Sequence, residues 1–283
     1  MTLPNPDTPL SLQPTEHTSM SIHPDSIATA AQLLRNAAAT GNFIAPLGET
    51  IPGLDVGSAY AIQKHNTDLK LQSGARLVGA KIGLTSLAVQ RQLGVDTPDY
   101  GVLFDDMWYG EGLPIPVAKL QQPKIEAEVA FVLGRDLDVE NPTVVDVISA
   151  IEYALPALEI VGSRIANWNI SLVDTIADNA SASGFVVGGS PKRLGELDLC
   201  VCRMSMSRDG ERSVSSGNGA ACLGSPLNAV VWLARTMTRV GAPLRAGQVI
   251  LSGALGPMVA VEAGRTYTAT IESLGRVSAV FDR

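Results

Sequence analysis

The sequence predicts an α+β fold, in which a helical N-terminal portion precedes a β-rich body containing a substantial mixed sheet or roll. Two stretches with helical periodicity lie between residues 25 and 73, whereas most apolar runs after residue 76 have the length and alternation typical of strands. The chain has 283 residues, of which 46% are hydrophobic and 17% charged. It is therefore long enough to bury a sizeable core.

The chain is expected to consist of three parts. Residues 1–24 are polar, rich in proline and without periodicity, which is typical of a disordered tail. Residues 25–75 are the N-terminal helical portion. Residues 76–283 are a β-rich domain, which holds the candidate catalytic residues described below.

Two helices are expected in the N-terminal portion. Asp25 and Ser26 can cap the first, at residues 25–40, and Gly41 ends it. A second helix is expected at about residues 55–73, stopped by the glycine that follows. The apolar face of the first helix is expected to contain Ile27, Ala30, Ala31, Leu34 and Ala38.

The rest of the chain is expected to be mostly strands. Two further helices are predicted, a short one at residues 86–94 and a longer one at residues 227–240. Asp209 and Gly210 indicate a hairpin turn. The apolar face of the longer helix is expected to contain Leu227, Val230, Val231, Ala234, Met237 and Val240. The predicted strands are residues 76–84, 100–104, 125–133, 154–165, 184–189, 248–253, 266–273 and 276–282.

Composition excludes several classes of protein. A net charge of −7 and a pI of about 5.0 argue against nucleic acid as a partner, because phosphate binding requires a basic face. No apolar run is long enough for a membrane span, and the N-terminus lacks the pattern of a secretory signal. Three cysteines without a CxxC pair indicate reduced thiols, so we expect a cytoplasmic protein.

Histidine is scarce in this chain. Of the three, His17 and His23 lie in the predicted tail, and His65 lies in a helical pattern. A mechanism based on a Ser-His-Asp or Cys-His arrangement, or on a histidine-rich zinc site, therefore has at most one histidine to use. If the protein is an enzyme, carboxylates and lysines must carry its chemistry.

Three glutamates in apolar segments are the strongest chemical signal. Glu126 and Glu128 lie two apart in a predicted strand, so both side chains project from one face. Glu159 interrupts a second apolar run. Buried carboxylates are costly unless they are paired or bound to metal, and oxygen ligands suit Mg²⁺ or Mn²⁺. The pattern alone leaves open the alternative that these residues are salt-bridged or lie on a solvated face.

Three other segments could contribute to a site. Lys81 lies at the end of an apolar strand, before Leu84, and could be a point charge, a proton donor or a surface lysine. Residues 174–184, which include Asp178, are small and polar and fit either a cleft-lining or a purely structural loop. Residues 251–257, which include Ser252, could offer backbone N–H groups to a carboxylate or form only a turn.

These segments resemble the 2-keto-4-pentenoate hydratase group within the fumarylacetoacetate hydrolase-like superfamily. The resemblance covers about residues 55–283, and the matching stretches occur in family order. They are GAKIGLTS, VDTPDYGVLFDDM, KIEAEVAFVLG, PALEIVGSRIANWNISLVDTIADNAS, CLGSPLNAVVWLAR and VILSGALGPMVAV.

The resemblance implies a mixed β-roll core with an N-terminal helical portion. It places the family's metal triad on Glu126, Glu128 and Glu159, its active-site lysine on Lys81 and the accompanying acid on Asp99, with Asp105 as a weaker candidate. Leu84, Asp178 and Ser252 are the expected substrate-binding residues. A homo-oligomer is also implied, and association with the next enzyme of the pathway is possible.

The implied reaction is the metal-dependent addition of water to 2-hydroxypenta-2,4-dienoate, giving 4-hydroxy-2-oxopentanoate in aromatic meta-cleavage catabolism. The metal would act as a Lewis acid, Lys81 would balance charge or relay a proton, and Asp99 would orient Lys81 or assist water. Three alternatives remain open at this point. They are a 4-oxalocrotonate decarboxylase, an acylpyruvate hydrolase, and a catalytically silent subunit that scaffolds a pathway partner.

Overall fold

The computed structural model describes residues 23–283, except residues 88–89, 92–93 and 211. The predicted tail, residues 1–24, therefore lies outside the described residues except for its last two. The short helix predicted at residues 86–94 also lies partly outside them.

The two predicted helices of the N-terminal portion are confirmed as α1 (Pro24–Thr40) and α3 (Val56–Gln72), and a short helix that was not predicted, α2 (Leu47–Thr50), lies between them. The predicted cap of α1 is wrong by two residues. The side chain of His23 accepts the Asp25 N–H, because Pro24 occupies the first helical position, where a missing N–H costs nothing.

Two details of the predicted helix faces are also wrong. In α1 the buried residue is Ala37 and not Ala38, because the buried stripe follows positions 30, 34 and 37. In α7 (Pro226–Arg239) the last predicted face residue, Val240, is 54% exposed, because it lies beyond the helix end. The buried residues of α7 are Pro226, Ala229, Val230, Leu233, Ala234 and Met237.

A seven-stranded mixed sheet forms the larger layer. Its order is β2 (Asp99–Phe104), β1 (Leu77–Gly83), β9 (Val249–Ala254), β4 (Lys124–Leu133), β5 (Ile151–Val161) and β6 (Ala182–Val187), with β10 (Val259–Ala260) paired to β4. The sheet is mixed because β1 runs parallel to β9, whereas β4 runs antiparallel to β9 and β5.

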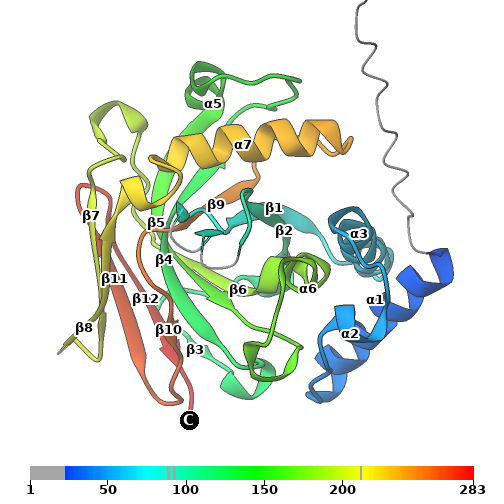
Figure 1. The fold of residues 1–283 in the computed structure, drawn as a ribbon. Coiled ribbons are helices and arrows are strands. Elements are labelled where there is room, and N and C mark those ends of the chain that lie inside the picture. Colours follow the sequence, from blue (N-terminus) through cyan, green and yellow to red (C-terminus); the bar gives the residue numbers. More distant parts are fainter. Residues whose placement is uncertain (1–22, 88–89, 92–93, 211) are drawn as a thin grey trace, which may run out of the picture.

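A five-stranded sheet forms the second layer. Its order is β3 (Pro114–Ile115), β12 (Gly275–Phe281), β11 (Thr266–Ile271), β7 (Arg203–Arg208) and β8 (Arg212–Asn218). The hairpin predicted between β7 and β8 is confirmed, with Asp209 and Gly210 both left-handed. Figure 1 shows this sheet beside the larger one.

The main core lies between the two sheets. One face of β4 contributes Ile125, Ala127, Val129, Phe131 and Leu133 to it, and β11 and β12 contribute Tyr267 and Phe281. α7 packs with α5 (Val144–Ala150) and against β9, whereas α6 (Leu172–Ala177) packs against α3 (Figure 1). The predicted α+β class with a mixed sheet is confirmed.

The alternation along β4 has a consequence for the site. Its odd-numbered residues face the core between the sheets, so the even-numbered Glu126 and Glu128 face the opposite side. In the described part of the chain, no helix combines the length and apolar character that crossing a bilayer would require.

Candidate metal centre

Three carboxylates from two neighbouring strands converge on one point. Glu126 and Glu128 project from β4, and Glu159 on β5 is the direct cross-strand partner of Glu126. One oxygen from each glutamate lies within 4.8 Å of the others. Glu128 and Glu159 are fully buried, whereas Glu126 is half-buried. The solvated-face alternative is therefore wrong for at least two of the three.

Few partners within the protein satisfy these carboxylates. Glu128 Oε2 accepts the Gly253 N–H at 2.8 Å, but Glu128 Oε1 accepts no hydrogen bond from the described residues. Neither oxygen of Glu159 accepts one, although Oε1 forms an ion pair with Lys81. Because leaving buried charged oxygens without partners is costly, the set fits a hard divalent cation with oxygen ligands.

The pKa shifts of two glutamates in this cluster also favour a bound cation. Burial, reinforced by the charge of Glu159, raises the pKa of Glu126 to about 7. Burial likewise raises the pKa of Glu128 well above its ordinary value, and the charges of Glu159 and Glu126 add to the effect. Without a cation these carboxyls tend to keep their protons, so a bound metal would have to displace them.

Lys81 on β1 reaches the cluster from the adjoining part of the sheet. Its ammonium lies 3.1 Å from Glu159 Oε1 and donates a 2.9 Å hydrogen bond to the carbonyl of Ala180. The side chain is buried, so the surface-lysine alternative is wrong. Burial lowers the pKa of Lys81, but Glu159 and Asp99 more than offset this, and the net pKa lies above its ordinary value. Lys81 is therefore a fixed positive charge and hydrogen-bond donor.

Asp99, the first residue of β2, completes the buried set. Its strand partner is Gly83 on β1, and a Cβ at Gly83 would lie only 2.2 Å from Asp99 Oδ1. Thr175 Oγ1 donates to Asp99 Oδ2 at 3.4 Å. Burial raises the pKa of Asp99, although Lys81 opposes the shift. A carboxyl whose pKa is raised in this way is suited to exchanging protons with a bound substrate.

The weaker acid candidate, Asp105, lies elsewhere. Its carboxylate accepts the Arg76 N–H at 3.1 Å and lies 3.7 Å from the Arg76 guanidinium at the surface. The charge of Asp99 acts on Lys81, whereas the described contacts of Asp105 are with Arg76. Geometry thus favours Asp99 as the acid that accompanies Lys81.

Two of the three predicted substrate-binding residues lie next to this cluster along the chain. Leu84 directly follows Gly83 and has a left-handed backbone, with φ of 56°. Ser252 is buried on β9, immediately before Gly253, whose N–H binds Glu128. The backbone N–H predicted for the 251–257 turn therefore binds a carboxylate of the protein itself.

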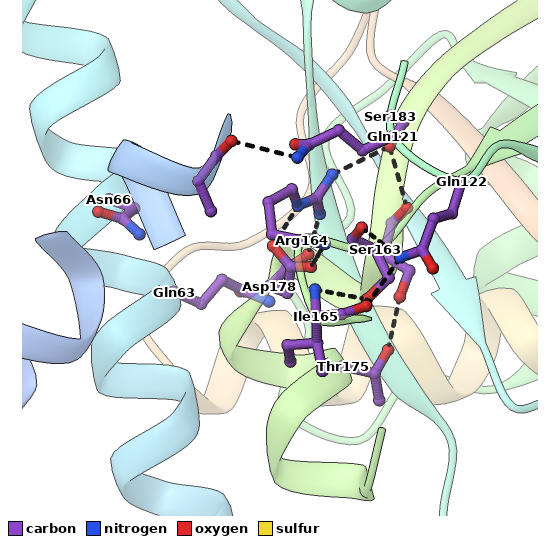
Figure 2. A network of polar contacts seen from close by, with 12 residues as sticks. Gln63, Asn66, Gln121, Gln122, Ser163, Arg164, Ile165, Thr175, Asp178 and Ser183 are labelled. Carbon is purple, nitrogen blue, oxygen red and sulfur yellow. Dashed lines mark hydrogen bonds and ion pairs between the residues drawn. The ribbon is translucent and has the colours of Figure 1, made fainter. Parts of the chain in front are cut away.

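Asp178, the third, forms a separate network. Its carboxylate accepts the backbone N–H of Arg164 at 3.0 Å and pairs with the Arg164 guanidinium at 2.5 Å (Figure 2). Arg164 also donates to Ser183. These residues line a cavity of about 620 Å³ that α1 and α3 also border. The described contacts thus join Asp178 to Arg164 and not to the three glutamates.

Sequence reasoning missed several residues that shape the site. Thr175 and Ala180 contact Asp99 and Lys81, and Gly83 leaves room for Asp99. The available signal was the small, polar composition of residues 174–184, which predicts an ordered loop but not which atoms it presents. The close approach at Gly83 depends on the pairing of β1 with β2, which the local sequence does not encode.

Comparison with known proteins identifies the family. Residues 58–281 match the model of the fumarylacetoacetate (FAA) hydrolase C-terminal family. The chain is 57% identical over 259 residues to a 2-keto-4-pentenoate hydratase of Paraburkholderia xenovorans (strain LB400), covering 92% of this chain and 96% of that protein. It is 55% identical to the TodF product hydratase of Pseudomonas putida, covering 90% and 95%.

A solved structure supports the same relationship. The 4-oxalocrotonate decarboxylase from Pseudomonas putida G7, complexed with magnesium and adipate, superimposes with a TM-score of 0.88 at 35% identity, over 92% of this chain and 98% of that one. The predicted β-roll fold is thereby confirmed. The chain belongs to the fumarylacetoacetate hydrolase family and, within it, to the 2-keto-4-pentenoate hydratases.

Proposed function

We propose that this protein is a divalent-metal-dependent hydratase that converts 2-hydroxypenta-2,4-dienoate (2-keto-4-pentenoate) to 4-hydroxy-2-oxopentanoate in aromatic meta-cleavage catabolism. One observation carries the proposal: three glutamates converge beside a buried lysine and a buried aspartic acid, and two of the three, Glu128 and Glu159, are fully buried with oxygens that accept no hydrogen bond from the described residues. The hydratases that share more than half of its sequence support the same reaction.

Glu126, Glu128 and Glu159 would hold the ion, and their all-oxygen set suits Mg²⁺ or Mn²⁺. Magnesium in the related decarboxylase structure supports this choice. When bound, the ion supplies Lewis-acid stabilisation of negative charge on the substrate's carboxylate and C2 oxygen.

The remaining chemistry is proton transfer by the protein's own side chains. In the first half, the enol loses its O–H proton and C5 gains a proton, which leaves a double bond between C3 and C4. Water then adds its oxygen at C4 and a proton at C3. Asp99, whose pKa is raised, would exchange these protons, and the Lys81 ammonium would bind the anionic substrate.

The test is a direct assay. Protein stripped with EDTA is mixed with 2-hydroxypentadienoate, and the loss of dienol absorbance is followed before and after Mg²⁺ or Mn²⁺ is added. We expect turnover only with metal, and formation of 4-hydroxy-2-oxopentanoate. A fully folded protein without metal-restorable turnover overturns the proposal. Release of carbon dioxide from 4-oxalocrotonate would favour the decarboxylase reaction instead, and cleavage of an acylpyruvate would favour the hydrolase.

Two wider properties belong to the same proposal. Three free cysteines support a reducing, cytoplasmic location. A homo-oligomer is also part of the proposal, carried over from the resemblance to the hydratase family. Sedimentation equilibrium of the purified protein tests the oligomer, and co-purification with the enzyme that consumes the hydroxy-keto acid tests a pathway complex.

A further inference from the structure

A short turn beside Lys81 has an unusual backbone. Asn179, Ala180 and Ser181 form one 3₁₀ turn, and their φ angles are 57°, 48° and 60°. Asparagine tolerates this left-handed region, but alanine and serine rarely adopt it, and three such residues in succession are uncommon. A backbone of this kind persists only where its surroundings determine it, and such segments cluster at functional sites.

The side chain of Asn179 fastens this turn to β2. Its Nδ2 donates to the carbonyl of Val102 at 2.9 Å, and its Oδ1 accepts the Val102 N–H at 2.8 Å. The amide thus binds β2 as the backbone of a neighbouring strand would. Gly101, which precedes Val102 on β2, permits the turn to lie close to the strand. A Cβ at Gly101 would lie only 2.3 Å from the carbonyl oxygen of Asn179.

The turn formed by Asn179, Ala180 and Ser181 supplies a hydrogen-bond acceptor for Lys81. The carbonyl of Ala180 accepts a 2.9 Å hydrogen bond from the buried ammonium, whose other described contact is Glu159. Lys81 is also the direct strand partner of Gly101. Asn179 therefore holds the turn against β2 at the point where β1 presents Lys81.

The same turn also reaches Asp99. The hydroxyl of Ser181 lies 3.2 Å from that of Thr175, which donates to Asp99 at 3.4 Å. All three residues are buried. One strained turn thus connects to both groups to which we assign proton transfer and substrate charge.

We propose that Asn179 is a positioning residue of this hydratase, which locks the left-handed turn so that the Ala180 carbonyl holds the Lys81 ammonium in place beside Glu159. The inference rests on the proposed function, because it concerns the role of Lys81 in that reaction. It assigns no contact with substrate to Asn179 itself.

The test replaces Asn179 with glycine. Glycine adopts a φ of 57° without strain, so the Asn179→Gly variant loses the two hydrogen bonds to Val102 but keeps the turn accessible. We expect kcat to fall by about 10- to 100-fold, since small misplacements of catalytic groups have effects of this size. KM should rise as well, because Lys81 is assigned to the anionic substrate, whereas the dissociation constant for Mg²⁺ should change by less than about threefold.

The matched control is Asn167→Gly. Asn167 is also a left-handed asparagine, with φ of 59°, but its side chain is exposed. Its kcat should stay within about twofold of wild type. If Asn179→Gly does not fold, Asn179→Asp replaces it, because aspartate tolerates this backbone and keeps the acceptor for the Val102 N–H. The expected loss in kcat is then about 3- to 10-fold.

A double-mutant cycle separates positioning from a merely structural role. In a Lys81→Ala background, Asn179→Gly should lower the residual rate by less than about twofold, because the group it positions is gone. An equal loss in both backgrounds, or an unchanged kcat in Asn179→Gly alone, overturns the inference while leaving the function intact. A folded wild-type protein without metal-restorable turnover overturns the proposed function, and the inference falls with it.

Discussion

At the scale of single residues, the site depends on which charges the fold removes from water. Glu128, Glu159, Lys81 and Asp99 are all buried. The charges of Glu159 and Asp99 raise the pKa of Lys81, and the charge of Glu159 adds to the rise that burial causes in the pKa of Glu128. Such a group of unlike charges is stable only if each member has a defined partner. Removing one member should therefore change the chemistry of the others in a specific way.

Glu126→Gln should lose most of its metal response. The amide keeps the size of the side chain but removes one negative ligand and its contribution to binding. Changes to outer-shell partners alone cost about 10- to 100-fold in affinity, so the loss of a ligand should cost at least that much. Isothermal titration with Mg²⁺ or Mn²⁺ measures it. Glu272→Gln, an exposed glutamate paired with Arg203, should bind metal as wild type does; equal affinities for the two variants would contradict the assignment.

Lys81→Ala should keep metal binding but lose rate. The variant retains all three glutamates, yet removes the positive charge next to Glu159 and Asp99. We expect kcat to fall by about 10²–10⁴-fold, the usual contribution of a proton-transfer or charge-stabilising group. Steady-state kinetics at saturating Mg²⁺ measures the change. A variant as active as wild type would show that Lys81 has no part in the reaction.

Gly83→Ala should damage catalysis through Asp99. The added Cβ would lie 2.2 Å from Asp99 Oδ1 and 3.3 Å from Lys81 Nζ, so the aspartate must move. We expect kcat to fall by about 10²-fold, with little change in metal affinity. Gly48→Ala on α2 is the control, since a Cβ there meets nothing within 4 Å. Similar kcat values for both variants would indicate that the position of Asp99 is unimportant.

At the scale of elements, β4 serves two purposes through its alternation. Its odd-numbered residues fill the core between the sheets, and its even-numbered glutamates project from the opposite face of the sheet, on the side of the site. A one-residue shift in register would exchange the two sets and place carboxylates in the apolar core. The packing of the apolar face therefore fixes where the glutamates lie.

Phe131→Ala should destabilise the protein strongly. Phe131 is fully buried in the main core, and comparable large-to-small substitutions cost about 3–5 kcal/mol. Urea unfolding, followed by circular dichroism, measures the free energy. Val145→Ala on α5, where the valine is 66% exposed, should change it by less than about 0.5 kcal/mol. A loss below about 1 kcal/mol for Phe131→Ala would contradict the assigned packing.

At the scale of the whole molecule, the buried carboxyls link stability to pH and metal. The pKa of Glu126 is raised from 4.5 to about 7, so between these values the metal-free folded state binds more protons than the unfolded state. The unfolding free energy therefore falls as the pH rises through this window, because stability falls with pH wherever the folded state holds the extra protons. Bound metal reverses this dependence of stability on pH, because the metal binds only the ionised carboxylates, which are more abundant at higher pH.

In EDTA, the protein should be less stable at pH 8 than at pH 5.5. We expect a difference on the order of 1 kcal/mol, after discounting for the partial exposure of Glu126. Saturating Mg²⁺ should restore the stability at pH 8. Urea unfolding at both pH values, with EDTA or Mg²⁺, provides the measurement. In the metal-free Glu126→Gln variant, the difference in unfolding free energy between pH 5.5 and pH 8 should be smaller. If the wild-type protein in EDTA is as stable at pH 8 as at pH 5.5, or more stable, the raised pKa of Glu126 is wrong.

Local sequence was sufficient for much of the fold. Periodicity located α1, α3 and α7, and alternation located the strands of the site, because these signals depend on neighbours along the chain. Errors occurred at helix ends, where Pro24 moved the cap of α1 and the chain left α7 before Val240. Those ends depend on the competition between capping groups and on packing, which periodicity does not report.

For the site, the sequence by itself determined that Glu126 and Glu128 share a face, since that follows from the two-residue repeat of a strand. The convergence of Glu159, the burial of Lys81 beside it and the closeness of Asp99 were decided by the tertiary structure. The same holds for the turn at Asn179, whose left-handed backbone exists only where β2 holds it. The physical reason is that strand register and side-chain contacts between distant segments arise from packing of the whole chain, and no local pattern encodes them.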